Sequence, residues 1–369
     1  MDEEQMLERA RLNQLQDENN RLRKELRDVD RETDLFRHLK DIVETQKPIT
    51  IYKSSQLIPK KQTKIKETAM LLLSDSHADQ QILSKRVQGL EDYNFDVACR
   101  RAERLVDTTI SHLFDNMKNY QFDHLIIAGL GDYSSGEIHN LQNYSKWGNA
   151  IKSSIGIGEL LACMIADFSR YFKQITVYSV PGNHARRSLK KDYHGAHNNW
   201  DYLTMIHAAT RLKPLIDEKR LRFVIPDAFS CEVDVYNYSF ILNHGDDIQG
   251  WGGSSLPYYG IERKTRRLIA VGAVKNKVPN YFLYGHFHTE TKHQHTTGET
   301  IINGAWTATD EFALEKLGAY SEPSQLLFGI HPKYGISWRM PVKLRVHNWK
   351  EEEQKVGRYE INIFESVKE

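Results

Sequence analysis

The chain has 369 residues, of which 40% are hydrophobic and 27% are charged, and its formal net charge is +1. These values are typical of a globular protein with one large domain or two ordinary ones. The small net charge excludes a global basic field, so any binding of a polyanion would have to come from local patches. No run of about 18 apolar residues occurs, which excludes a membrane-spanning helix.

The cysteines and the first residues predict a cellular location. Cys99, Cys163 and Cys231 are odd in number and widely spaced, so neither a disulfide framework nor a zinc site is expected from them. The first residues are acidic and have no apolar core, unlike a signal peptide. Together these features predict an intracellular, cytoplasmic protein.

Residues 1–45 contain no Gly or Pro and are rich in charged side chains. With Leu12 at heptad position a, the d positions hold Leu15, Leu22, Val29, Phe36 and Val43. Asn19 falls at a later a position, where a single Asn fixes the register of parallel dimers. We therefore predict a coiled-coil helix that forms a homodimer through residues 12–43. The alternative is an amphipathic helix that lies on the chain's own globular domain.

Residues 46–67 are expected to be a linker, because they contain Pro48, Pro59 and a basic cluster. From residue 68 onward, short apolar runs alternate with helical patterns, which predicts an α/β fold. Strands are expected at residues 69–73, 124–128, 175–180, 222–225, 232–235, 239–243, 281–284 and 300–303. Helices are expected at residues 95–120, 151–172, 198–212 and 257–274.

The last part of the chain is also strand-like, at residues 325–330, 335–340 and 359–364. We expect a main domain over residues 68–310. Residues 311–369 are expected to be a C-terminal extension that completes or caps this domain.

Five short polar clusters follow strand-like runs in a fixed order. They are Asp75-Ser76-His77, Gly131-Asp132, Gly182-Asn183-His184, His244-Gly245 and Gly285-His286-Phe287-His288. Ligands of layered α/β sheets bind beyond the carboxyl ends of the strands, so the clusters are expected to meet at one site. A single His after a strand is more often a packed or capping residue. The joint occurrence of all five clusters, with their Asp, Asn and His side chains, predicts a two-metal hydrolase.

In this order the clusters resemble the signature of the calcineurin-like metallophosphoesterase superfamily. The resemblance covers about residues 68–305 and implies a four-layer β-sandwich flanked by helices. It implies that one metal ion binds Asp75, His77 and His288, that a second binds Asn183, His244 and His286, and that Asp132 bridges the two. It also implies that His184 contacts the substrate without binding metal and acts in catalysis together with the bridging Asp132.

The residue types suit Mn²⁺, Fe or Zn²⁺ better than Ca²⁺ or Mg²⁺. The resemblance implies two divalent metal ions and favours Mn²⁺, with Fe, Zn²⁺ or Mg²⁺ as alternatives. The resemblance implies that a hydroxide bridging the two ions attacks the phosphoester. Two positions depart from the family pattern. Ala185 and Ser135 stand where many members carry acidic or amide side chains. The group that orients His184 is therefore open, with Glu137 and Asp79 as candidates.

Three residues are predicted to bind substrate. Arg186 and Arg187 directly follow His184 and could take flanking phosphates, and Trp251 lies in a Gly-rich loop and could stack on a base. Each also has a plain structural interpretation, as a solvated turn or a ring packed on the surface.

The leading prediction is a phosphodiesterase that acts on a phosphate-containing substrate, a nucleic acid or a nucleotide. This prediction follows a similarity to SbcD-type nucleases and to phosphoesterases common in phage genomes. The alternatives are a phosphomonoesterase, acting on a protein or a small molecule, and a catalytically weak coiled-coil scaffold.

Overall fold

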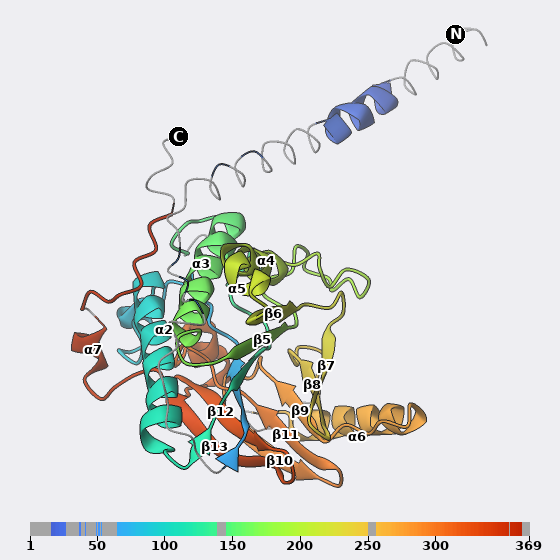
Figure 1. Cartoon of the computed structure of the whole chain (residues 1–369). Coiled ribbons are helices and arrows are strands. Elements are labelled where there is room, and N and C mark those ends of the chain that lie inside the picture. Colours follow the sequence, from blue (N-terminus) through green and yellow to red (C-terminus); the bar gives the residue numbers. More distant parts are fainter. Residues whose placement is uncertain are drawn as a thin grey trace, which may run out of the picture. The chain divides into compact units, whose positions relative to one another are not determined.

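Two mixed β-sheets lie at the centre of the fold in a computed structural model of the chain (Figure 1). The structure describes residues 16–26, 37, 41, 49, 51, 53, 65–138, 145–249, 256–353 and 355–363. The chain divides into two units, one of residues 49–361 and the other of residues 1–48 with 362–369. Both sheets belong to the first unit, and the expected α/β fold is confirmed.

The first sheet has six strands in the order β13-β12-β2-β4-β5-β6. Four of them run parallel: β2 (Thr68–Leu73), β4 (His124–Gly129), β5 (Gln174–Ser179) and β6 (Leu221–Val224). The hairpin of β12 (Ser324–His331) and β13 (Gly335–Lys343) pairs antiparallel with β2 on its other side. Residues beyond position 310 are therefore part of this sheet.

The second sheet has five strands in the order β10-β11-β9-β8-β7. They are β7 (Ser230–Val235), β8 (Tyr238–Asn243), β9 (Tyr281–Tyr284), β10 (Thr291–His295) and β11 (Gly298–Ile302). Strands β8, β9 and β11 are parallel, and the two edge strands are antiparallel to their neighbours. A separate parallel pair joins β1 (Ile65–Lys66) to β3 (Tyr120–Gln121).

The main hydrophobic core lies between the two sheets. Met70 and Leu72 of β2 share one buried cluster with Phe240 and Leu242 of β8 and with Leu283 of β9. Side chains at i and i+2 face the same side of a strand, so one face of each sheet supplies this layer. The sheets therefore pack face to face, and their strand ends are held in a fixed relation.

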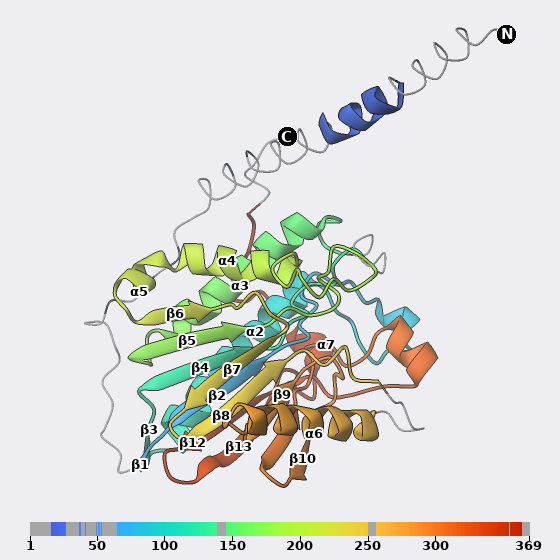
Figure 2. The same cartoon turned by 90° about the vertical axis from the view of Figure 1, so that its right-hand side faces the viewer.

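Helices cover the outer faces of both sheets (Figure 2). Leu71 and Leu73 of β2 and Ile127 of β4 line a small apolar void together with Leu161 of α3 (Ala150–Phe168) and Met205 of α4 (Trp200–Arg211). Next to α3 lies α2 (Phe95–Ile110), and the short α5 (Lys213–Asp217) follows α4.

On the second sheet, Ile261, Leu268 and Ile269 of α6 (Tyr258–Val274) pack against Phe282 and Tyr284 of β9. One further short helix, α7 (Trp349–Glu352), lies near the end of the unit. The sheets and helices thus form two mixed sheets flanked by helices.

Three of these helices begin at an asparagine cap. The side-chain oxygens of Asn94, Asn149 and Asn199 accept hydrogen bonds from backbone N–H groups in the first turns of α2, α3 and α4. Such caps satisfy N–H groups that have no partner inside the helix. They explain why each helix starts directly after a polar loop.

Two expected elements differ from the structure. The helix expected over 95–120 ends as α-helix at Ile110 and continues as the π-helical segment η3 (Ser111–Asn116). The prediction of a strand over residues 359–364 was wrong at residues 359–361, which pair with no strand in the described part of the chain. The backbone N–H of Tyr359 donates instead to Glu103 (2.8 Å) and its hydroxyl donates to Asp167 (2.7 Å). Tyr359 and Ile361 are buried, so the alternating pattern reflects packing on helices and not on a sheet edge.

In the other unit, residues 16–26 are helical, and Leu22 and Leu26 are exposed to 54% and 64%. Leu12, Leu15, Val29, Phe36 and Val43 lie outside the described residues, so the coiled coil and the homodimer stay predictions. Within the described part of the chain, no helix has the length and apolar character needed to cross a bilayer.

A buried ion cluster joins α2 to the segment at α7. Arg101 of α2 has no exposed surface, and its guanidinium bonds to Glu91 at 2.9 and 3.0 Å and to Glu353 at 3.0 and 3.1 Å. It also donates to the carbonyl oxygen of Trp306. Arg345 lies 3.7 Å from Glu91 as well, so Arg101 is the cation that the two buried carboxylates share.

We expect the substitution Arg101→Ala to lower the free energy of unfolding by about 3–5 kcal/mol, because it removes the bidentate partner of two buried carboxylates. Urea unfolding followed by circular dichroism measures this change. The matched control is Arg266→Ala, which removes an exposed arginine paired with Glu262 in the same helix and should cost less than about 1 kcal/mol. Equal losses for the two variants would contradict the assigned role of the cluster.

Candidate metal centre

The five polar clusters lie in the loops directly after β2, β4, β5, β8 and β9. Five of their residues, Asp75, His77, Asp132, His286 and His288, have φ between +38° and +69°. A positive φ is uncommon for residues other than Gly and costs on the order of 1–3 kcal/mol. Such strain persists where the surroundings impose it, and it gathers at functional sites. The loops are therefore held in a conformation that serves their side chains.

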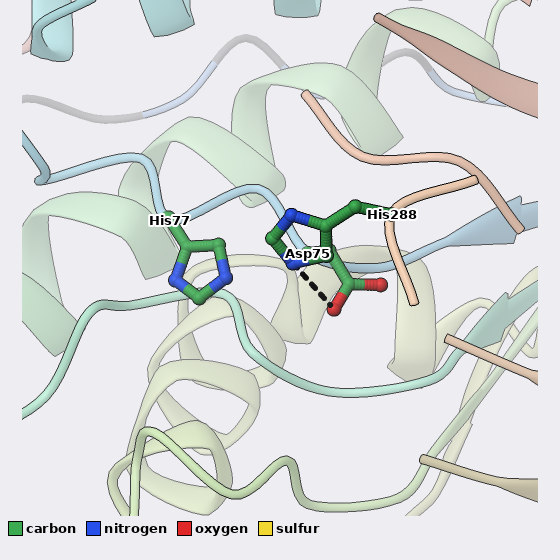
Figure 3. A group of neighbouring side chains, drawn as sticks. All are labelled: Asp75, His77 and His288. Carbon is green, nitrogen blue, oxygen red and sulfur yellow. Dashed lines mark ion pairs between the residues drawn. The ribbon is translucent and has the colours of Figure 1, made fainter. Parts of the chain in front are cut away.

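The loops after β2 and β9 bring together Asp75, His77 and His288 (Figure 3). Their potential ligand atoms all lie within 4.8 Å of one another. Asp75 is fully buried, and its two oxygens accept hydrogen bonds from the backbone N–H of His286 at 3.0 and 3.1 Å. Nε2 of His288 lies 3.5 Å from Oδ1 of Asp75. This group contains the three residues expected to hold one metal ion.

A second group of the same kind contains Asp132, His244 and His286, and a third contains His77, Asp132 and His184. Asp132 belongs to the second and third groups, and His77 belongs to the first and third groups. A buried carboxylate shared between groups can bridge two cations.

The atoms around the imidazole of His244 indicate what charge can be accommodated beside it. Its Nδ1 lies 2.7 Å from the carbonyl oxygen of Leu130, and since a carbonyl only accepts, the proton of the neutral ring is on Nδ1. On the other side of the ring, Nε2 lies 2.9 Å from Oδ2 of Asp132 and 2.9 Å from Oδ1 of Asn183. Three electron-rich atoms converge in a buried place only around positive charge.

The chemistry of this convergence suits a divalent metal ion. An imidazole nitrogen, a carboxylate oxygen and an amide oxygen are ligand atoms for Mn²⁺, Fe or Zn²⁺, and the bond from Nδ1 of His244 to a backbone carbonyl is typical of metal-binding His. Although burial lowers it, the carboxylate of Asp132 raises the pKa of His244 to about 10. The residues present therefore fit a cation at this place.

Two other imidazoles of the cluster are held neutral. Burial, followed by the nearby His184, lowers the pKa of His77 to about 3. Burial and His244 lower the pKa of His286 to about 4. Nδ1 of His77 is buried and has no hydrogen-bond partner among the described residues. Neutral imidazoles with available lone pairs are what metal binding requires.

Asp201, at the start of α4, is a supporting residue that we did not predict. Its carboxylate accepts hydrogen bonds from the backbone N–H groups of Asp132 (2.8 Å), Gly182 (2.9 Å) and Tyr133 (3.1 Å). The side chain of Asn199, the helix cap, donates to the carbonyl of Gly182 at 3.0 Å. The first turn of α4 thus fixes the loops after β4 and β5. The sequence shows an acid close to a helix-capping Asn, but not which backbone groups that acid would bind.

Glycine is needed where these two loops meet. A Cβ on Gly131 (φ +89°) would lie 2.3 Å from the backbone nitrogen of Gly182, and a Cβ on Gly182 would lie 2.1 Å from Oδ1 of Asp132. Any larger residue would push the Asp132 loop away from the Asn183 loop.

The loop that carries Asp75 is held by residues from late in the chain. The backbone N–H of Ser74 donates to Oε1 of Gln325 (2.9 Å), and the side chain of Asn303 donates to the hydroxyl of Ser74 (2.9 Å). The backbone N–H of Trp306 donates to the carbonyl of Asp75 at 3.0 Å. Nothing in the local sequence of Gln325 or Asn303 indicated this role.

His184 lies at the edge of the cluster and is half-buried. Its backbone N–H donates to Oδ1 of Asp132 at 2.8 Å, and its ring stands edge-on to His77 with 4.7 Å between centroids. The two side chains proposed to orient the imidazole of His184 form hydrogen bonds with other groups. Asp79 accepts from the backbone N–H of Ser135 (2.8 Å), and Glu137 accepts from the indole of Trp200 (3.2 Å).

The predicted substrate-binding residues have different positions. Arg186 donates through Nε to the carbonyl of Asn183 at 3.0 Å, and Arg187 donates to Asn198 at 3.1 Å. Both line a pocket on the surface. Lys191, from the same basic run, makes a bidentate bond to Asp246 (2.9 Å to each oxygen) and so ties this loop to the one after β8. Trp251 lies outside the described residues.

No family model matches the chain, and no curated protein matches it. An archaeal phosphodiesterase aligns with 74% of this chain and 99% of its own, at 12% identity and a TM-score of 0.31. Vps29 from Entamoeba histolytica in complex with Zn²⁺ aligns over 74% and 99%, at 10% identity and 0.29. YfcE, a phosphoesterase from E. coli, aligns over 74% and 100%, at 14% identity and 0.30. TM-scores of this size do not establish a common fold.

We expect Asp201→Asn to weaken the binding of Mn²⁺ by about 10–100-fold, because an amide cannot accept from all three backbone N–H groups and the Asp132 loop shifts. Isothermal titration of the metal-free protein with Mn²⁺ measures the dissociation constant. The control is Asp217→Asn, at an exposed surface pair with Lys213, which should leave it unchanged. An unchanged constant in Asp201→Asn would show that this carboxylate does not support the centre.

Proposed function

We propose that the chain is a dinuclear metal-dependent phosphodiesterase that acts on a nucleic acid or a nucleotide. The observation that carries the proposal is the convergence of Asp132 and Asn183 oxygens on Nε2 of His244, in a buried place that favours positive charge and offers three ligand atoms to a metal ion. One ion would bind Asp75, His77 and His288, and the second would bind Asn183, His244 and His286, with Asp132 shared. Two divalent ions, Mn²⁺ first among them, would supply Lewis acidity toward a phosphoryl oxygen and activate a water molecule.

The chain's own residues then have distinct tasks. The neutral rings of His77 and His286 and the carboxylates of Asp75 and Asp132 hold the ions, and Asp201 keeps the Asp132 loop in place. His184 stands beside this set, where an imidazole can donate a proton to the leaving oxygen or stabilise the transition state. Arg186, fixed by its bond to Asn183, retains guanidinium N–H groups for an anionic substrate.

The first test compares a diester with a monoester. We expect the Mn²⁺-loaded protein to hydrolyse bis-p-nitrophenyl phosphate with a higher kcat/KM than p-nitrophenyl phosphate, as measured by p-nitrophenolate release. Elemental analysis of the dialysed protein should find about two metal ions per chain. Preference for the monoester would favour a phosphomonoesterase. Less than about one ion per chain, with no hydrolysis of either ester, would favour a scaffold.

A second test addresses His184. We expect His184→Asn to lower kcat by about 10²–10⁴-fold, the usual size of a lost proton-transfer contribution, while the metal content stays at that of the unsubstituted protein. The control is His293→Asn, an exposed histidine on the edge strand β10. Loss of a metal ion in His184→Asn would instead make His184 a ligand, together with His77 and Asp132.

A further inference from the structure

A surface pocket of about 310 Å³ lies beside the metal centre. It is formed mainly by the loop between β5 and α4, and its lining includes Arg186, Arg187, Ser188, Asp192, Asn198 and Phe229. This volume is at the lower end of the range for small-ligand sites, roughly 300–1,000 Å³. The pocket can therefore take one ring system with its substituents, but not a duplex.

The wall of the pocket is bonded directly to the loop that carries a proposed metal ligand. Nε of Arg186 donates to the carbonyl of Asn183, and the side chain of Asn199 donates to the carbonyl of Gly182. Arg186 and Arg187 are three and four residues from Asn183. A phosphate at the metal centre would therefore have its substituent within reach of the pocket.

The polar side chains that line the pocket include both positively and negatively charged ones. The guanidinium of Arg187 is held in place by Asn198 at 3.1 Å and by the face of the Trp200 ring, 5.5 Å from its centroid. Asp192 brings a carboxylate and Asn198 an amide. A pocket for a second phosphate would gain nothing from a carboxylate, which repels the anion. Donors and acceptors in one small space instead match the edge of a nucleobase.

The aromatic part of the lining is rigid. The ring of Phe229 contacts Lys191, whose Nζ lies 4.4 Å from the ring centroid, and stands edge-on to Tyr193. Lys191 is itself fixed by its two bonds to Asp246. Lys191 covers one face of the Phe229 ring, which lines the pocket, and aromatic rings and arginine planes are the groups on which single bases stack.

We infer that this pocket binds the nucleoside of a phosphodiester whose phosphate lies at the metal centre. The inference rests on the proposed function and adds to it the site that binds the nucleoside of the substrate. Phe229 and the plane of Arg187 contact the base, and Asp192 and Asn198 bond to its edge.

The test uses two diesters with the same leaving group. One is the p-nitrophenyl ester of thymidine 5′-monophosphate, and the other is methyl p-nitrophenyl phosphate, in which a methyl group replaces the nucleoside. We expect kcat/KM of the Mn²⁺-loaded protein to be about tenfold or more higher for the nucleoside ester, in line with base stacking. In Phe229→Leu, this ratio should fall toward one while hydrolysis of the methyl ester is kept. Arg187→Ala should lower kcat/KM for the nucleoside ester more than that for the methyl ester, so that the ratio falls there too.

The matched control is Arg222→Ala, which removes an exposed arginine of β6 that does not line the pocket and should keep the ratio. A ratio near one in the unsubstituted protein would overturn the inference and leave the proposed function intact. If neither ester is hydrolysed by protein that holds two ions, the proposed function fails.

Binding is then measured apart from catalysis, by titrating the metal-free protein with thymidine 5′-monophosphate. Affinity that Arg187→Ala weakens about tenfold supports the pocket, and equal affinity of both proteins overturns it.

The nucleoside could come from a free nucleotide or from the end of a nucleic acid. A cyclic adenosine monophosphate, a thymidine dinucleotide and a single strand of twelve nucleotides separate these sources by their kcat/KM values. If one of these substrates has a higher kcat/KM than the other two, it identifies the source of the nucleoside. A reduction of that kcat/KM in Arg187→Ala supports the pocket. If Arg222→Ala lowers the three kcat/KM values as much as Arg187→Ala does, the assignment of the nucleoside to this pocket is overturned.

Discussion

The centre depends on one electrostatic constraint, which is that acceptor atoms meet where water cannot separate them. Nε2 of His244 faces the oxygens of Asp132 and Asn183, and Nδ1 on the other side of the ring bonds to the carbonyl of Leu130. A proton or a metal ion must therefore supply positive charge there. The strained loop conformations, the helix-start carboxylate of Asp201 and the glycine contact between two loops all keep this arrangement in place.

The packing of the two sheets determines the centre as much as the ligands do. Asp75, Asp132 and Asn183 follow strands of the first sheet, whereas His244 and His286 follow strands of the second. Their distances are therefore set by the hydrophobic layer between the sheets, which includes side chains such as Leu72 and Phe240. A close-packed layer fixes such relations to a fraction of an ångström, so a change in this core would alter the centre without touching a ligand.

Most strands and the meeting of the polar clusters at the strand ends could be predicted from the sequence, because buried parallel strands are continuous apolar runs and the polar clusters end them. Strand β10 could not be predicted, since Thr291–His295 is a polar edge strand with no apolar pattern. Asp201 and Gln325 could not be assigned because their role depends on which backbone groups the tertiary fold places in front of them. The segment at Tyr359 was predicted as a strand and is not one. Its alternating apolar pattern reflects the burial of side chains against helices.

The pairing of β12 with β2 has a consequence for how the centre is assembled. Leu327 pairs with Leu71, and Gln325 holds Ser74, across a separation of about 250 residues. Contacts of such long range form late and slowly, because the intervening chain must first be ordered. During synthesis the Asp75 loop lacks its hydrogen-bond partner until residue 325 has been made. The Asp75 loop is therefore among the last parts of the candidate metal centre to be held in place.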